Sequence, residues 1–211
     1  MTLFNRKLTR VALAVGSLAL LAGCASMMYT PPTPEETAAV IKSGFRERGV
    51  AKLDRLQQSE LQAACSKYPK GDLPKDLRDK LEKAAMASVK YPADGKWLGD
   101  WKQGERIAQS GVGMTFTDAP NATSGGNCYA CHQMTKEEIS YGNIGPTLLN
   151  FGKLRGNSEP IMRYTWAKIW NAHAFNACSS MPRFGDAGIL TEDQIRHVMA
   201  LLLDPQSPVN K

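Results

Sequence analysis

Cys128-Tyr129-Ala130-Cys131-His132 places two cysteines three positions apart and a histidine directly after the second. This spacing is the attachment signature of a c-type haem. The two thiols add to the two vinyl groups on one edge of the porphyrin, and the histidine then lies under the iron. A chance pairing, a redox-active Cys-x-x-Cys and half of a zinc site are the alternatives. The sequence has no second Cys-x-x-Cys and no His-x-x-x-His, so we interpret the motif as a covalent haem site.

The N-terminal residues have the features of an export signal. Basic residues precede an apolar run over residues 11–21 that is too short for a comfortable membrane span. The run ends in Leu21-Ala22-Gly23-Cys24, which resembles a bacterial lipobox. The resemblance implies that residues 1–23 are removed, that Cys24 is lipidated and that the protein lies on the periplasmic side of the outer membrane. An ordinary signal peptide, cleaved near Ala22 or Ala25, would instead give a soluble periplasmic protein.

The five cysteines divide in a way that agrees with export. Haem attachment uses Cys128 and Cys131 and the lipobox uses Cys24, which leaves Cys65 and Cys178. Since c-type haem assembly and stable disulfides both belong to compartments outside the cytoplasm, we expect a Cys65–Cys178 disulfide. Two buried free cysteines, or a thiol that faces a partner, are the alternatives.

The charge of the chain gives little indication of a nucleic-acid partner. The formal net charge is +6, and removal of three basic residues with the signal would leave +3. Nucleic-acid binding would show a clustered basic stripe, whereas the charges here are mixed and spread. We therefore expect no nucleic acid among the partners.

The remaining chain predicts an all-α protein in three parts. Residues 24–33 are rich in proline and favour an extended tether. Residues 34–95 predict a helical extension, with helices starting near Pro34, over 53–65 and over 74–89. This extension has no metal-ligand cluster, and it could serve as a lid, a partner-binding arm or a spacer. Residues 96–211 predict the haem domain.

Three helices are predicted in the haem domain. The first covers residues 100–108 and contains Gly104, which costs about 1 kcal/mol against alanine unless another helix crosses closely there. A second covers residues 160–175. The last begins at the capping residue Thr191 and ends before Pro205.

Two segments of this domain resemble class I cytochromes c. Gly145-Pro146-Thr147-Leu148 is similar to a segment in which the proline carbonyl accepts a hydrogen bond from the axial histidine, which implies a contact between Pro146 and His132 Nδ1. The axial methionine of that class lies on the loop before the last helix, where this chain has Met181. A His132/Met181 pair leaves no open position on the iron, so the expected chemistry is electron transfer. Other methionines and histidines are rival ligands. We expect Met114 and Met134 in flanking loops, and Met162 and Met199 as packing residues in helices. We expect His173 and His197 on helix surfaces.

The haem motif, residues 141–146, residues 175–185 and residues 188–195 together resemble SoxX, the monohaem subunit of bacterial SoxAX complexes. The resemblance covers residues 97–208. It implies an L-cysteine S-thiosulfotransferase whose catalytic haem sits on the SoxA partner, while this chain accepts the electrons released as thiosulfate is joined to a cysteine of the carrier SoxYZ. One haem c on this chain would then pass electrons to a small downstream cytochrome. Arg183 and Phe184 are candidates for the haem edge or the subunit interface, and loop packing is the alternative.

Three other functions fit the motifs without that resemblance. The chain could be a generic exported monohaem electron shuttle. It could be a lipid-anchored scaffolding subunit, in which the extension matters more than the haem. It could also be a haem sensor with a labile sixth ligand.

Overall fold

The computed structural model describes residues 30–211, so Cys24, the signal over residues 1–23 and most of the tether over residues 24–33 lie outside the described residues. Within the described range, regular structure is helical apart from one isolated bridge between Arg48 and Ala51. The all-α prediction is confirmed. The chain divides into two compact units, residues 1–45 and 46–211. The boundary drawn at 95/96 from the sequence falls inside the second unit.

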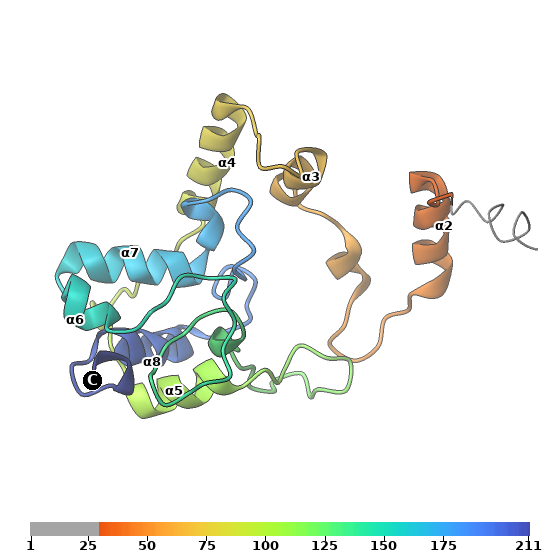
Figure 1. Cartoon of the computed structure of the whole chain (residues 1–211). Coiled ribbons are helices and arrows are strands. Elements are labelled where there is room, and N and C mark those ends of the chain that lie inside the picture. The colour runs from red at the N-terminus through yellow and green to blue at the C-terminus, as the bar shows by residue number, and fades with distance from the viewer. Residues whose placement is uncertain (1–29) are drawn as a thin grey trace, which may run out of the picture. The chain divides into compact units, whose positions relative to one another are not determined.

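The described part of the first unit contains α2, Pro34–Gly44 (Figure 1). Thr33 caps it, because its hydroxyl accepts from the Glu36 N–H and the Glu36 carboxylate accepts from the Thr33 N–H in return. Pro34 stands at the first helical position, where its missing N–H costs nothing. The helix start predicted from the sequence is therefore confirmed.

The second unit begins with the rest of the extension, which forms η1, α3 and α4. These cover Leu53–Leu56, Glu60–Lys67 and Lys75–Ala87. The single helix predicted over residues 53–65 is divided in two because Ser59 caps α3. Its hydroxyl accepts from the Gln62 N–H, while the Gln62 side chain accepts from the Ser59 N–H. This capping box fixes a new helix start.

The chain after the extension adds four α-helices and three short 3-10 turns to the second unit (Figure 1). They are α5 (Trp101–Gln109), η2 (Cys128–Ala130), α6 (Phe151–Arg155), α7 (Glu159–Trp170), η3 (Ala172–Ala174), α8 (Glu192–Leu203) and η4 (Pro208–Asn210).

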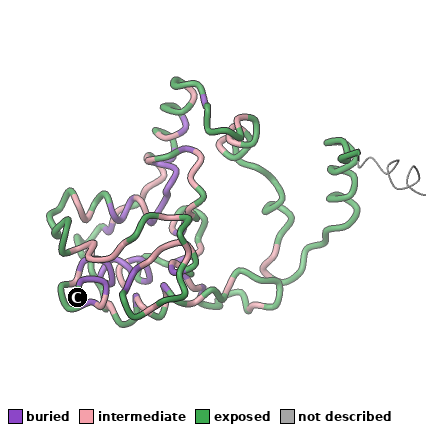
Figure 2. The backbone as a smooth tube through the Cα atoms, in the orientation of Figure 1, coloured by how far each residue is buried: buried purple, intermediate pink, exposed green. Residues whose placement is uncertain are grey.

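Helices α5 and α8 pack directly against one another, and most residues of α8 are buried (Figure 2). A Cβ atom added to Gly104 would lie 2.1 Å from the backbone oxygen of His197, so only glycine allows this approach. The helix crossing expected at Gly104 is confirmed. The main core includes Trp166, Ile195 and Leu201, each with no exposed surface.

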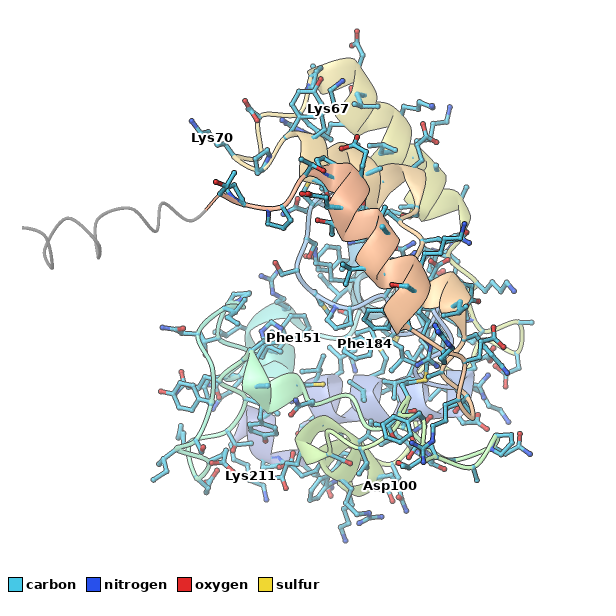
Figure 3. All side chains as sticks on the ribbon, turned by 90° about the vertical axis from the view of Figure 1, so that its right-hand side faces the viewer. Lys67, Lys70, Asp100, Phe151, Phe184 and Lys211 are labelled. Atoms are coloured by element: carbon cyan, nitrogen blue, oxygen red, sulfur yellow. A yellow bond between two sulfur atoms is a disulfide. The ribbon has the colours of Figure 1, made fainter. Side chains whose placement is uncertain are left out.

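A second, smaller core joins the extension to the segment after η3. Leu73 and Leu81 from the extension are buried together with Ala177. The structure also bonds Cys65 of α3 to Cys178 through a disulfide that connects residues 113 positions apart. Lys67 at the end of α3 and Lys70 in the following segment are labelled in Figure 3 and are exposed. The disulfide and the buried Leu73 thus attach α3 and α4 to the rest of the second unit, so this region is not a free arm.

The helix predicted over residues 160–175 ends earlier, at Trp170. The Asn171 side chain accepts from the His173 N–H and starts the separate turn η3. His173 is consequently buried, and its Nε2 lies 3.1 Å from the Ser179 carbonyl. The expectation that His173 lies on a helix surface was wrong, because α7 ends at Trp170 and the Asn171 side chain starts a new turn there.

Candidate haem-attachment site

The turn η2 gathers the three residues of the motif. The N–H groups of Cys131 and His132 both donate to the carbonyl of Cys128, at 3.1 and 2.9 Å. Cys128 and Cys131 are free thiols, and each is partly exposed at the residue level. Desolvation of the Cys128 sulfur raises the pKa of its thiol to about 12. The two thiols and the imidazole of the motif therefore lie on one tight turn.

His132 is held by one contact to the backbone. Its Nδ1 lies 2.7 Å from the carbonyl oxygen of Pro146. A carbonyl can only accept, so Nδ1 carries a hydrogen, and in the neutral imidazole Nε2 is then the nitrogen with the lone pair. A neutral imidazole whose other nitrogen donates to a carbonyl is the arrangement found for histidines that bind metals. The contact between Pro146 and His132 is the one implied by the resemblance to class I cytochromes c.

The segment over residues 142–148 runs beside the motif and fixes the position of Pro146. Backbone N–H groups of Gly142, Gly145 and Leu148 donate to the carbonyls of residues 129, 131 and 133, at 2.9, 2.8 and 2.7 Å. The imidazole lies against Gly145, where an added Cβ would approach Cε1 of His132 to 2.2 Å. The absence of a side chain at this position lets the ring reach the Pro146 carbonyl.

A second contact ties the motif to α5. The hydroxyl of the buried Tyr129 donates to the Glu105 carboxylate at 2.9 Å. Burial raises the pKa of Tyr129, so the phenol remains a donor. Sequence reasoning missed this contact, and no spacing rule could have found it, because Glu105 and Tyr129 are joined only by the fold.

The loop of Met181 is fixed on its C-terminal side by Trp170. The N–H groups of Gly185 and Asp186 both donate to the Trp170 carbonyl at 3.1 Å. A Cβ on Gly185 would lie 2.3 Å from the Trp170 ring, so loop and indole are in close contact. Met181 is partly buried and packs against the same apolar cluster as Cys128. The structure therefore brings these two distant predicted residues to one core.

Arg183 and Phe184 follow Met181 and have different surroundings. Phe184, labelled in Figure 3, is buried in the main core. Arg183 forms an ion pair with Asp186 at 3.1 Å. Both contacts are internal to the unit, and they agree with the loop-packing alternative.

The other candidate ligands have positions of their own. Met134 and Met199 are fully buried in the core, whereas Met114 is exposed at a left-handed backbone position and Met162 is partly buried. His197 lies on α8, as expected, but its Nδ1 accepts the Asp100 N–H at 2.8 Å, and it thereby positions the start of α5.

Several features of the described residues fit a haem group. The Nδ1 of His132 is engaged with a carbonyl, which leaves Nε2 as the nitrogen for a metal, and the two thiols are not paired with one another. The indole N–H of Trp170 is buried without a hydrogen-bond partner in the described structure, and a haem propionate is an acceptor of the kind it lacks. Over residues 30–211 no group of three or more His, Cys, Asp or Glu side chains is arranged to hold a metal ion, so the second half of a zinc site was not found there.

Comparison with known proteins gives one relative with high similarity. An uncharacterized lipoprotein of Aquifex aeolicus is 36% identical over 160 residues, which cover 73% of this chain and 73% of that protein. The chain belongs to this lipoprotein family. No protein-family model matches the sequence. None of the helices in residues 30–211 of this family member is long and apolar enough to span a membrane.

Proposed function

We propose that this lipoprotein-family member is a monohaem c-type cytochrome with a class I fold. Cys128 and Cys131 would hold one haem c through thioethers, with His132 and Met181 as axial ligands. The observation that carries the proposal is the 2.7 Å contact between His132 Nδ1 and the Pro146 carbonyl, next to the Cys-x-x-Cys-His turn. The buried and unpartnered indole N–H of Trp170 supports it independently.

The haem, when bound, would supply one-electron transfer between its two iron oxidation states. The chain prepares for that task through its own contacts. The Pro146 carbonyl fixes the tautomer and raises the basicity of His132. Gly145 leaves room for the ring, and the core around Met181 gives an apolar surrounding that excludes water. These residues orient and insulate a redox centre, and none of them is proposed to act as an acid or a base.

We infer further that the chain serves as the electron-transfer subunit of a SoxAX-type L-cysteine S-thiosulfotransferase. SoxA would perform the sulfur chemistry on the carrier SoxYZ, and this chain would accept the electrons and pass them to a downstream cytochrome. The resemblance around Cys128, Pro146 and Met181 supports this assignment. The relative's description as a lipoprotein supports a lipid anchor, which we place at Cys24. The periplasmic side of the outer membrane is part of the proposal and rests on the lipobox resemblance. Mass spectrometry of the mature N-terminus tests the lipid.

One experiment separates this function from a generic electron shuttle and from a haem sensor. The full chain is produced in a host that matures c-type haem, and haem content is measured per polypeptide. It is then mixed with SoxA and SoxYZ, and thiosulfate-dependent reduction of its haem is followed. We expect one haem per chain and reduction only in the complete mixture. A haem-loaded chain that binds no SoxA is a generic shuttle, and one that binds carbon monoxide readily is a sensor. A chain without haem refutes the proposal.

Replacement of Met181 by alanine should remove the weak band at the red end of the oxidised spectrum that marks a methionine–iron bond. Met199→Ala is the matched control, because Met199 is fully buried in the core and is expected to affect stability alone. Retention of the band in Met181→Ala would show that another residue is the sixth ligand.

A further inference from the structure

We infer that the extension acts as a brace for the Met181 loop, with Cys65, Cys178 and Glu82 as positioning residues for Met181. This inference rests on the proposed haem ligation. It assigns a role to α3 and α4 that neither the motif nor the relative suggests. The extension would set how firmly the sixth ligand is held, rather than act as a lid or a spacer.

The segment before Met181 receives its anchors from the extension. The disulfide from Cys65 of α3 fixes Cys178, three positions before the methionine. The carboxylate of Glu82 on α4 accepts the Ala177 N–H at 3.1 Å. Ala177 itself is buried in the small core beside Leu81. A charge-assisted hydrogen bond thus holds Ala177, and a disulfide holds the next residue, Cys178.

Ser179, the residue after Cys178, connects these anchors to Met181. The Ser179 hydroxyl accepts the Met181 N–H at 3.2 Å, and the Ser179 carbonyl lies 3.1 Å from Nε2 of His173. The buried His173 stands in η3, which packs against α4. A shift of α3 or α4 away from the loop would therefore act on the backbone that carries Met181.

The two sides of the loop are held differently. After Met181, the chain is fixed by Trp170 of the main domain through Gly185 and Asp186. Before it, the strongest contacts come from residues more than ninety positions away in the extension. Loss of those contacts would leave the segment before Met181 more weakly held, by contacts such as that of Ser179 with His173. Met181 would then dissociate more often while the main core stays intact.

The test compares four versions of the haem-loaded full chain with wild type. Glu82→Ala removes the acceptor of the Ala177 N–H, and Glu82→Gln restores a neutral acceptor. Cys65→Ser combined with Cys178→Ser removes the disulfide without leaving a single thiol. Glu60→Gln is the matched control, because the ion pair of Glu60 with Lys80 joins α3 to α4 without touching the loop.

The readouts are the methionine–iron band, the reduction potential and the rate of carbon monoxide binding to the reduced protein. Since a hydrogen bond to a charged group has a substantial energy, we expect Glu82→Ala to raise the carbon monoxide rate about tenfold and to weaken the band. Glu82→Gln should bring the carbon monoxide rate and the band strength most of the way back to wild type. The double serine variant should show changes as large as those of Glu82→Ala or larger. Glu60→Gln should resemble wild type in both readouts.

Two results would overturn the inference. If Glu82→Ala and the double serine variant lower only the melting temperature, with the band, the potential and the rate unchanged, the extension has a purely structural role. If Glu60→Gln changes the rate as much as Glu82→Ala, no specific brace exists. Absence of haem from the wild-type chain refutes the proposed function itself, and it is recognised before any variant is measured.

Discussion

For the proposed haem protein, Gly145→Ala should alter the environment of the iron through His132 while leaving the fold intact. The new Cβ would stand 2.2 Å from Cε1 and 2.5 Å from Nδ1 of His132. An ordinary carbon contact needs about 3.5 Å or more, so the ring must move by about 1 Å. A movement of that size breaks a hydrogen bond that is 2.7 Å long.

The expected size of the effect follows from that hydrogen bond. An intramolecular hydrogen bond contributes about 1 kcal/mol. Without this hydrogen bond, the His132 imidazole would donate electron density less strongly to the iron. The oxidised iron would then be destabilised more than the reduced iron. Since a tenfold change in equilibrium corresponds to about 59 mV for one electron, the reduction potential should rise by about 40 mV.

The assay is a redox titration of the haem-loaded chain, with circular dichroism to check the fold. Gly44→Ala is the control, because an added Cβ there has no atom within 4 Å. A potential that is unchanged in Gly145→Ala, or equally raised in Gly44→Ala, would refute the link between Gly145, the ring and Pro146.

Two predictions concern the stability of the chain. Gly104→Ala should lower the free energy of unfolding by about 2 kcal/mol, or the melting temperature by about 6 °C, because the Cβ would meet the rigid backbone of His197. Thermal unfolding checks this, and an unchanged melting temperature would contradict the close crossing. Burial lowers the pKa of His173, so near its ordinary pKa the unfolded chain binds a proton that the folded chain does not. Stability should therefore fall as the pH drops below about 6.5, and denaturant unfolding should show a smaller fall for His173→Gln. An equal fall in both proteins would exclude His173 as the cause.

Local patterns in the sequence predicted the local structure well. The capping residue Thr33 marks the start of α2, and Thr191 marks that of α8. In both cases a side chain bonds backbone groups three residues away, so all the needed information lies within one turn. The contact of His132 with Pro146 is longer in range, and it came from the resemblance rather than from any pattern.

Contacts between distant segments could not be predicted from the sequence in the same way. Ring centroids of Tyr91, Trp97, Trp166 and Trp170 follow one another at 5.9, 5.9 and 6.2 Å, and the indole of Trp166 donates to the Lys90 carbonyl at 2.8 Å. This row joins the end of the extension to α7. Aromatic residues are common in protein cores, but which ring meets which depends on the packing of separate helices. The prediction for His173 was wrong for a related reason, since the Asn171 side chain starts a new turn earlier than the apolar pattern indicated.

The four cysteines in the described residues impose an order on the biogenesis of this protein. Cys65 and Cys178 are joined, whereas Cys128 and Cys131 are free. Haem ligation would require the second pair to stay reduced in the same oxidising compartment that closes the first. Neighbouring cysteines form a disulfide with each other more readily than cysteines 113 positions apart, because the loop they close is short. If the chain carries the proposed haem, a cell that makes it would have to keep Cys128 and Cys131 reduced until haem arrives. Production with an oxidant alone should then yield a folded chain that can no longer accept haem.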